Sequence, residues 1–142
     1  MYKKILVALE NGPADESVIP HVAALAKQLG SELLLVHVAD GWVARNFNQL
    51  KLAESEEMKA DRAYLESIAS KFRAQGLRAT TRLALGDPPA EILKAAESEK
   101  CSLIAMTSHG HRLIGDLVFG STIHEVRHKT NIPVLLVRAE KR

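Results

Sequence analysis

Residues 2–38 read YKKILVALENGPADESVIPHVAALAKQLGSELLLVHV, a stretch with two apolar runs separated by a helical pattern. Residues 5–9 are apolar without interruption and give way to a polar turn at residues 10–13, which predicts a strand buried on both faces. Residues 33–38 predict a second strand of the same kind. A strand, a helix and a further strand in this order form a unit in which the two strands are parallel.

The segment between these two strands predicts a helix that begins near Val18. Its apolar residues recur at helical spacing, at Val18, Val22, Ala26 and Leu29. Gly30 stands where a helix commonly ends in a left-handed residue. Pro20 fits the first turn if Ser17 is the N-cap, because the first turn needs no backbone N–H within the helix.

The rest of the chain continues the alternation of helices and strands. We expect helices at about residues 52–75, 88–98 and 121–130, and strands at about residues 77–85, 102–107 and 133–138. Gly76 would end the first of these helices, and Asp87 is a candidate N-cap for the helix that begins with Pro88. Residues 39–50 include the only tryptophan, Trp42, and predict a surface loop rather than a lid or a docking site.

The alternation decides the fold class. The strands are apolar on both faces, and right-handed crossovers between them give an α/β fold with one parallel sheet between two helix layers. In such a sheet a ligand binds beyond the carboxyl ends of the strands, at the point where the strand order reverses. We therefore look for a site among the turns that follow the first, second and fourth strands.

The composition narrows the class of protein. The 142 residues, 46% of them hydrophobic, predict one domain over residues 1–142. The 19 Lys and Arg residues nearly balance the 17 Asp and Glu residues, and the lack of a basic block argues against nucleic-acid binding. A single cysteine, Cys101, excludes an intrachain disulfide and agrees with a cytoplasmic protein. The apolar run near the N-terminus is too short for a signal peptide or a membrane span.

Residues 107–122 read TSHGHRLIGDLVFGST and are the strongest candidate for a binding loop. Backbone N–H groups near Gly110 and Gly120, with the N-terminus of the helix that follows, could hold a phosphate group without a lysine. The hydroxyls of Ser121 and Thr122 could add donors, and Arg112 could pair with a phosphate. These residues could also be only turn, helix-capping and surface residues, which are common in α/β domains.

Other chemistries have weaker support. Glu10, at the end of the first strand, could accept hydrogen bonds from ribose hydroxyls or could be a solvated carboxylate. His124 and His128 lie four apart on a helix, and His109 and His111 flank Gly110, but neither spacing comes with the further ligands of a zinc site, so we expect no metal. Cys101 precedes a buried strand and is expected to be an inert thiol, and His21 and His37 are expected to be structural.

Two familiar nucleotide motifs are absent from the sequence. There is no GxxxxGK[ST] and no GxGxxG after the first strand, so the machinery of ordinary ATPases and dehydrogenases is not expected. We assign no catalytic residue. If the protein acts on ATP at all, we expect at most weak hydrolysis.

Over nearly its whole length, apart from the loop around Trp42, the sequence resembles the universal stress proteins. The nucleotide-binding motif of that family is Gly, two residues, Gly, nine residues, Gly, and then Ser or Thr. Gly110, Gly120 and Ser121 match it, while Thr107 stands in place of the first glycine. Glu10 stands where the family usually has Asp.

The resemblance implies a Rossmann-like fold with five strands in the order 3-2-1-4-5. It implies ATP or AMP as ligand, with or without Mg²⁺, with adenine near Val38, and a homodimer through the last strand, Pro133–Val137. The expected nucleotide contacts are Leu9, Glu10, Val38, Thr107, Gly110, His111, Arg112, Gly120, Ser121 and Thr122. The leading hypothesis is a dimeric stress-response regulator whose nucleotide occupancy alters contacts with unknown protein partners. The alternatives are a slow ATP hydrolase and an interaction module with a vestigial site.

Overall fold

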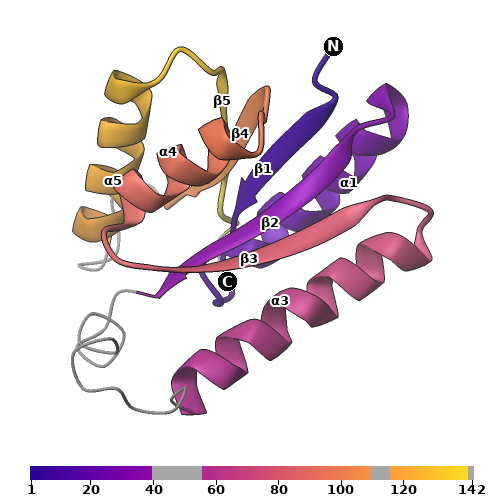
Figure 1. Cartoon of the computed structure of the whole chain (residues 1–142), viewed down its shortest axis with the longest axis horizontal. Helices are drawn as coiled ribbons and strands as arrows, with labels where there is room; N and C mark the ends of the chain where they lie inside the picture. The colour runs from indigo at the N-terminus through magenta and orange to yellow at the C-terminus, as the bar shows by residue number, and fades with distance from the viewer. Residues whose placement is uncertain (40–55, 110–115, 141–142) are drawn as a thin grey trace.

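The computed structural model describes residues 1–39, 56–109 and 116–140 (Figure 1). Its elements are β1 (Lys4–Ala8), α1 (Asp15–Leu29), β2 (Glu32–Ala39), α3 (Glu56–Ala74), β3 (Ala79–Leu85), α4 (Pro88–Ser98), β4 (Leu103–Ser108), α5 (Asp116–Lys129) and β5 (Val134–Arg138). The predicted alternation of strands and helices is confirmed. The loop around Trp42 and the expected helical residues 52–55 lie outside the described residues.

The five strands form one parallel sheet in the order β3-β2-β1-β4-β5, as predicted. β1 is therefore the central strand, and its Val7 lies opposite Leu35 of β2 on one side and Ala105 of β4 on the other. The strand order reverses at β1, so the carboxyl ends of β1 and β4 flank a crevice of the kind that holds ligands in doubly wound folds. The chain enters β1 at one end of the parallel sheet and leaves β5 at the opposite end (Figure 1).

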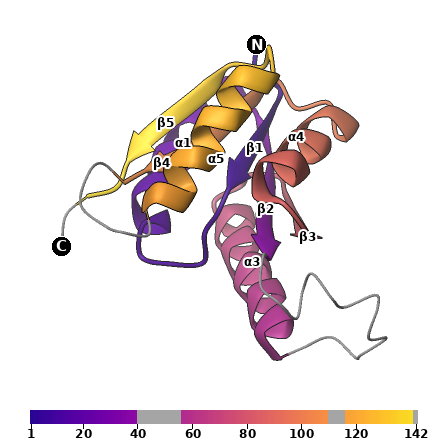
Figure 2. The same ribbon diagram turned by 90° about the vertical axis from the view of Figure 1, so that its left-hand side faces the viewer.

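Helices cover both faces of the sheet (Figure 2). Alternate strand residues point to opposite faces, so each strand contributes to two cores. The core beneath α1 and α3 contains Ile5, Val7, Leu33, Leu35, Leu65 and Phe72. The core beneath α4 and α5 contains Leu6, Leu34, Val36, Ile92, Ile104 and Val126. This two-layer burial explains why the strands are continuous apolar runs rather than alternating ones.

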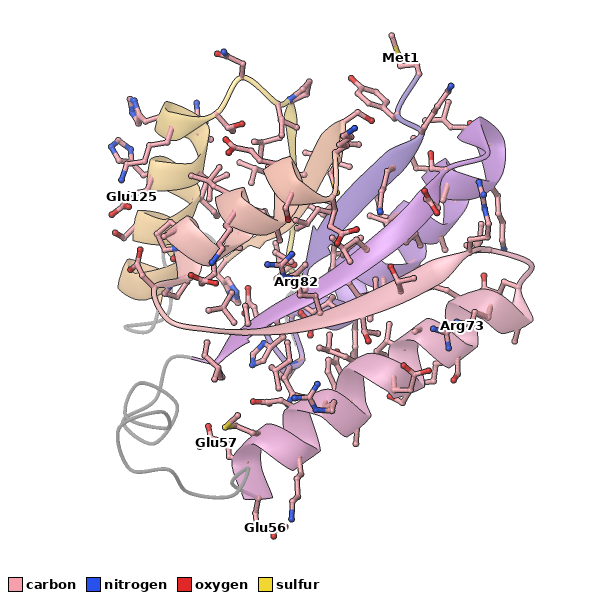
Figure 3. The ribbon with its side chains drawn as sticks, viewed as in Figure 1. Met1, Glu56, Glu57, Arg73, Arg82 and Glu125 are labelled. Atoms are coloured by element: carbon pink, nitrogen blue, oxygen red, sulfur yellow. The ribbon has the colours of Figure 1, made fainter. Side chains whose placement is uncertain are left out.

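Helix α3 is attached to the sheet at its C-terminal end. Arg73 lies there, and Glu56 and Glu57 lie at the opposite end of the helix (Figure 3). The Nε and Nη2 atoms of Arg73 donate to the carbonyl of Ala79, the first residue of β3, at 3.0 and 2.8 Å. The intervening turn passes through Gly76, whose φ of 87° is left-handed, as expected for a residue that ends a helix.

Two local helix signals behave as predicted. Gly30 is the left-handed C-cap of α1, with a φ of 68°. Asp87 is the N-cap of α4 and accepts a hydrogen bond from the N–H of Ala90 at 3.4 Å, with Pro88 as the first helical residue. Among the described residues no helix is long and apolar enough to cross a membrane.

The start of α1 was predicted wrongly. The helix begins at Asp15, so Ser17 is not its N-cap and Pro20 lies inside the helix rather than in its first turn. Asp15 and Glu16 stabilise the earlier start, because carboxylates favour the positive end of the helix dipole. The Ser17 hydroxyl instead accepts a hydrogen bond from the N–H of Glu140 at 3.0 Å and thereby ties the segment after β5 to α1.

The start of α5 also differs from the prediction. The helix begins at Asp116, so Gly120 and Ser121 lie inside it and not at its N-terminus. No helix-breaking residue precedes Gly120 in this segment, and a single glycine costs a helix only about 1 kcal/mol. The N–H of Gly120 is consequently used within the helix.

Candidate functional site

A pocket opens at the carboxyl ends of β1, β2 and β4, where the fold predicts a ligand site. Its volume is 230 Å³. The apolar part of the lining comes from β1, β2 and β4, from the residue after β1, and from α4 and α5, and consists of Ala8, Leu9, Val36, Val38, Pro88, Ile92, Met106 and Ile123. Glu10, His37, Thr107 and Thr122 supply polar side chains. An apolar slot with a few polar groups is the usual composition of a small-molecule site.

The structure brings part of the predicted residue set together. The predicted residues that line the pocket are Leu9, Glu10, Val38, Thr107 and Thr122. Ser121 is exposed, and Gly120 lies within α5. Gly110, His111 and Arg112 lie outside the described residues. The pocket thus contains the residues expected from β1, β2 and β4, and Thr122 from α5.

A histidine–carboxylate hydrogen bond crosses the site between the ends of β1 and β4. The Nε2 atom of His109 lies 2.8 Å from both carboxylate oxygens of Glu10, and both side chains are largely buried. The sequence suggested His109 only as a metal ligand, and its contact with Glu10 was not predicted. The available signal was topological, since Glu10 follows β1 by two residues, His109 follows β4 by one, and the two strands are neighbours.

The loop after β1 rests on a buried carboxylate. Asp15, which is only 1% exposed, accepts hydrogen bonds from the N–H groups of Glu10 and Asn11, both at 2.9 Å. The hydroxyl of Tyr64 donates to the same carboxylate at 2.6 Å. Burial and this hydrogen bond raise the pKa of Tyr64, so the phenol remains a donor at any physiological pH. Asp15 was another residue that the sequence analysis did not select.

Thr107 occupies the position of the first glycine in the family motif. Its side chain is 3% exposed, and its hydroxyl has no hydrogen-bond partner within the described part of the chain. A buried hydroxyl without a partner costs about 1 to 3 kcal/mol. Relative to glycine, the threonine therefore adds bulk at the edge of the pocket, and a hydroxyl that the described residues do not satisfy.

The metal hypothesis gains no support from the described residues. His109 is engaged with Glu10, and His124 and His128 are exposed on α5, with ring centroids 4.2 Å apart. Residues 1–39, 56–109 and 116–140 contain no group of three or more potential metal ligands. Cys101 is buried, and burial raises the pKa of its thiol to about 11, which agrees with an inert thiol.

These features define an α/β protein with a pocket at the switch point of a doubly wound parallel sheet. The model of the universal stress protein family matches residues 1–138, and the chain belongs to that family. The universal stress protein MJ0577 of Methanocaldococcus jannaschii is 30% identical, over 97% of this chain and 96% of its own.

Solved structures have the same fold. The structure of MJ0577 superposes with a TM-score of 0.82 at 29% identity and covers 100% of this chain and 99% of its own. A universal stress protein from Archaeoglobus fulgidus in complex with dAMP has a TM-score of 0.71 at 22% identity, covering 96% and 98% of the two chains. A universal stress protein in complex with cAMP has a TM-score of 0.70 at 16% identity, covering 98% of each chain.

Proposed function

We propose that this protein binds an adenine nucleotide, ATP or AMP, in the pocket at the carboxyl ends of β1, β2 and β4. The observation that carries the proposal is the position of the pocket at the switch point, combined with an apolar slot and polar groups beside it. Two proteins of the same fold have been solved with dAMP and cAMP. In this proposal the protein is a cytoplasmic homodimeric stress-response regulator, and the bound nucleotide changes its contacts with other proteins.

In this proposal the adenine base pairs with the backbone N–H and carbonyl of Val38. The even-numbered residues of β2 direct their backbone groups toward β1, since the N–H of Glu32 donates to Lys3 and the carbonyl of Val36 accepts from Leu9. Val38 is the next residue of this set and lies beyond the end of β1, so its N–H and carbonyl point past that strand. A donor and an acceptor side by side complement the N1 acceptor and the N6 amino donor of adenine.

In this proposal the ribose and the phosphates of the nucleotide lie near the carboxyl end of β4 and near α5. Glu10, with Leu9 beside it, would accept hydrogen bonds from the ribose hydroxyls near Thr107. The phosphates would lie against Gly110, Gly120, Ser121 and Thr122, with His111 and Arg112 nearby and Mg²⁺ held mainly by the phosphate oxygens. Contact with the N–H of Gly120 requires the first turn of α5 to open, because that group is bonded within the helix.

A thermal-shift measurement tests the proposal. Ligand at about a hundred times its Kd adds roughly 2.7 kcal/mol to the free energy of unfolding, so ATP or AMP should raise Tm by about 8 to 11 °C. Ala8→Phe, which fills the pocket from the end of β1, should abolish the rise. Ala24→Phe, at an exposed position of α1, is the matched control and should keep it.

The opposite result would favour a different function. If ATP, ADP and AMP, each with and without magnesium, all leave the melting curve of the wild-type protein unchanged, the nucleotide proposal is wrong. The interaction module with a vestigial site then takes its place. The substitution of glycine by Thr107 and the helical position of Gly120 are the observations that favour this second candidate.

A further inference from the structure

Three consecutive residues at the end of β1 are each held by a side chain from elsewhere in the fold. The carbonyl of Leu9 accepts from Nδ1 of His37 at 2.8 Å. The N–H groups of Glu10 and Asn11 donate to the two carboxylate oxygens of Asp15, each at 2.9 Å. The backbone that carries Glu10 to the pocket is therefore fixed at three successive positions.

Helix α3 supplies the outer part of this network. Tyr64 donates to Oδ2 of Asp15 at 2.6 Å, and the side-chain amide of Asn11 donates to Oδ1 of Asp61 at 2.7 Å. The other oxygen of Asp61 lies 3.5 Å from Nε2 of His37. Asp61 and Tyr64 lie one turn apart on α3. Asp61 lies beside His37 and Tyr64 contacts Asp15, and these are the two side chains that hold the loop backbone.

The network imposes one particular loop conformation. Asn11 has a φ of 61°, in the left-handed region that non-glycine residues rarely adopt. Asp61 is 6% exposed, and a carboxylate buried to that extent is tolerated only where donors satisfy it. Apolar packing alone would not specify the direction of the Glu10 and Asn11 N–H groups, whereas their hydrogen bonds to the buried Asp15 carboxylate do, and the bond from the Asn11 side-chain amide to Asp61 fixes the side chain of Asn11.

We propose that Asp61 and Tyr64 are positioning residues of the nucleotide site, which hold the loop after β1 so that Glu10 faces the ligand. The inference rests on the proposed function, because Glu10 is there the acceptor for the ribose hydroxyls. Neither α3 residue lines the pocket. Since coupling between two sites is reciprocal, nucleotide binding also stabilises the attachment of α3 to the sheet.

Tyr64→Phe tests the inference, because it keeps the ring and removes only the donor to Asp15. We expect the Kd for AMP to rise by about 5- to 10-fold, while the Kd for 2′,3′-dideoxyadenosine monophosphate, which lacks the hydroxyls that Glu10 would contact, stays within about twofold. Tyr2→Phe is the matched control and should leave both Kd values unchanged. In a Glu10→Ala background, Tyr64→Phe should have no further effect on AMP binding.

A second measurement needs no ligand. In the unliganded protein, Tyr64→Phe and Asp61→Ala should each accelerate hydrogen exchange of the Glu10 and Asn11 amides by about tenfold or more, with the amides of β4 unchanged. Unchanged exchange at these two amides would overturn the inference, as would an equal loss of affinity for AMP and its dideoxy analogue. Failure of the wild-type protein to bind any adenine nucleotide would instead overturn the proposed function, and with it the ligand-linked part of this inference.

Discussion

His109 and Glu10 join the ends of β4 and β1 through a histidine ring nitrogen that lies 2.8 Å from both carboxylate oxygens. Strands β1 and β4 come from opposite halves of the chain, and this contact closes the sheet at the edge where the pocket opens. The same carboxylate is the proposed ribose acceptor. Its orientation therefore depends on β4 as well as on the network behind β1.

Removal of the histidine should weaken the fold. A hydrogen bond to a charged group contributes about 1.5 to 3 kcal/mol, so His109→Ala should lower the free energy of unfolding by about that amount in urea titrations, with little change in the m value. His21→Ala, at an exposed position of α1, should change it by less than about 0.5 kcal/mol. Equal effects of the two substitutions would show that the contact between His109 and Glu10 does not stabilise the protein.

Gly120→Ala should have opposite effects on the free and the bound protein. Alanine favours helix by about 1 kcal/mol over glycine, so the substitution should raise Tm in the absence of nucleotide, because residue 120 lies inside α5. It should reduce the Tm rise given by ATP, because the helix must open there for the backbone to reach the phosphates. Differential scanning calorimetry with and without ATP measures both effects, and an undiminished ATP response would place the phosphates elsewhere.

The edge strand β5 should pair with its copy in a second chain. Among the described residues β5 has a strand neighbour on one side only, and its Leu136 is 39% exposed, which leaves an apolar edge that a symmetric dimer would cover. Leu136→Asp should halve the sedimenting mass from twice 15.6 kDa and leave the far-UV circular dichroism spectrum unchanged. Leu29→Asp, at a leucine of α1 that is 40% exposed, should leave the dimer intact. A wild-type protein that sediments at the mass of one chain would contradict the prediction.

Cys101 should react slowly with thiol reagents in the native protein. Burial raises the pKa of its thiol to about 11, above the value of about 8.5 in an unfolded chain. Since the native pKa is the higher one, the stabilising contribution is complete below about pH 8.5 and is lost as the pH rises toward 11. The wild-type protein should thus lose more stability over this interval than Cys101→Ala. A rate of reaction with a disulfide reagent at pH 8 equal to that of denatured protein would contradict this.

Features that depend only on residues close together in the sequence, such as helix ends and strands, could be predicted. Gly30 and Asp87 end and begin helices through contacts with residues only a few positions away, and the apolar runs define the strands. The apolar pattern begins at Val18 and so places the start of α1 too late, whereas the acidic residues Asp15 and Glu16 favour the earlier start. The contact of Asp15 with Tyr64, which lies far along the chain, could not be predicted from local sequence. The Glu10–His109 pair was missed for the same reason. The role of each residue depends on strand order, which local patterns do not encode.

The central position of β1 affects how the protein is made. The ribosome releases β1 first and β2 soon afterwards, but the strand that covers the other side of β1 is β4, which follows most of the chain. Until β4 emerges, Leu6 and Val7 lie in a strand with one open edge, and unpaired apolar edges are prone to pair with other chains. A nascent chain whose synthesis stops between β3 and β4 can therefore aggregate through β1, the strand that is synthesised first. A chaperone would be needed most while the ribosome synthesises the segment between β3 and β4.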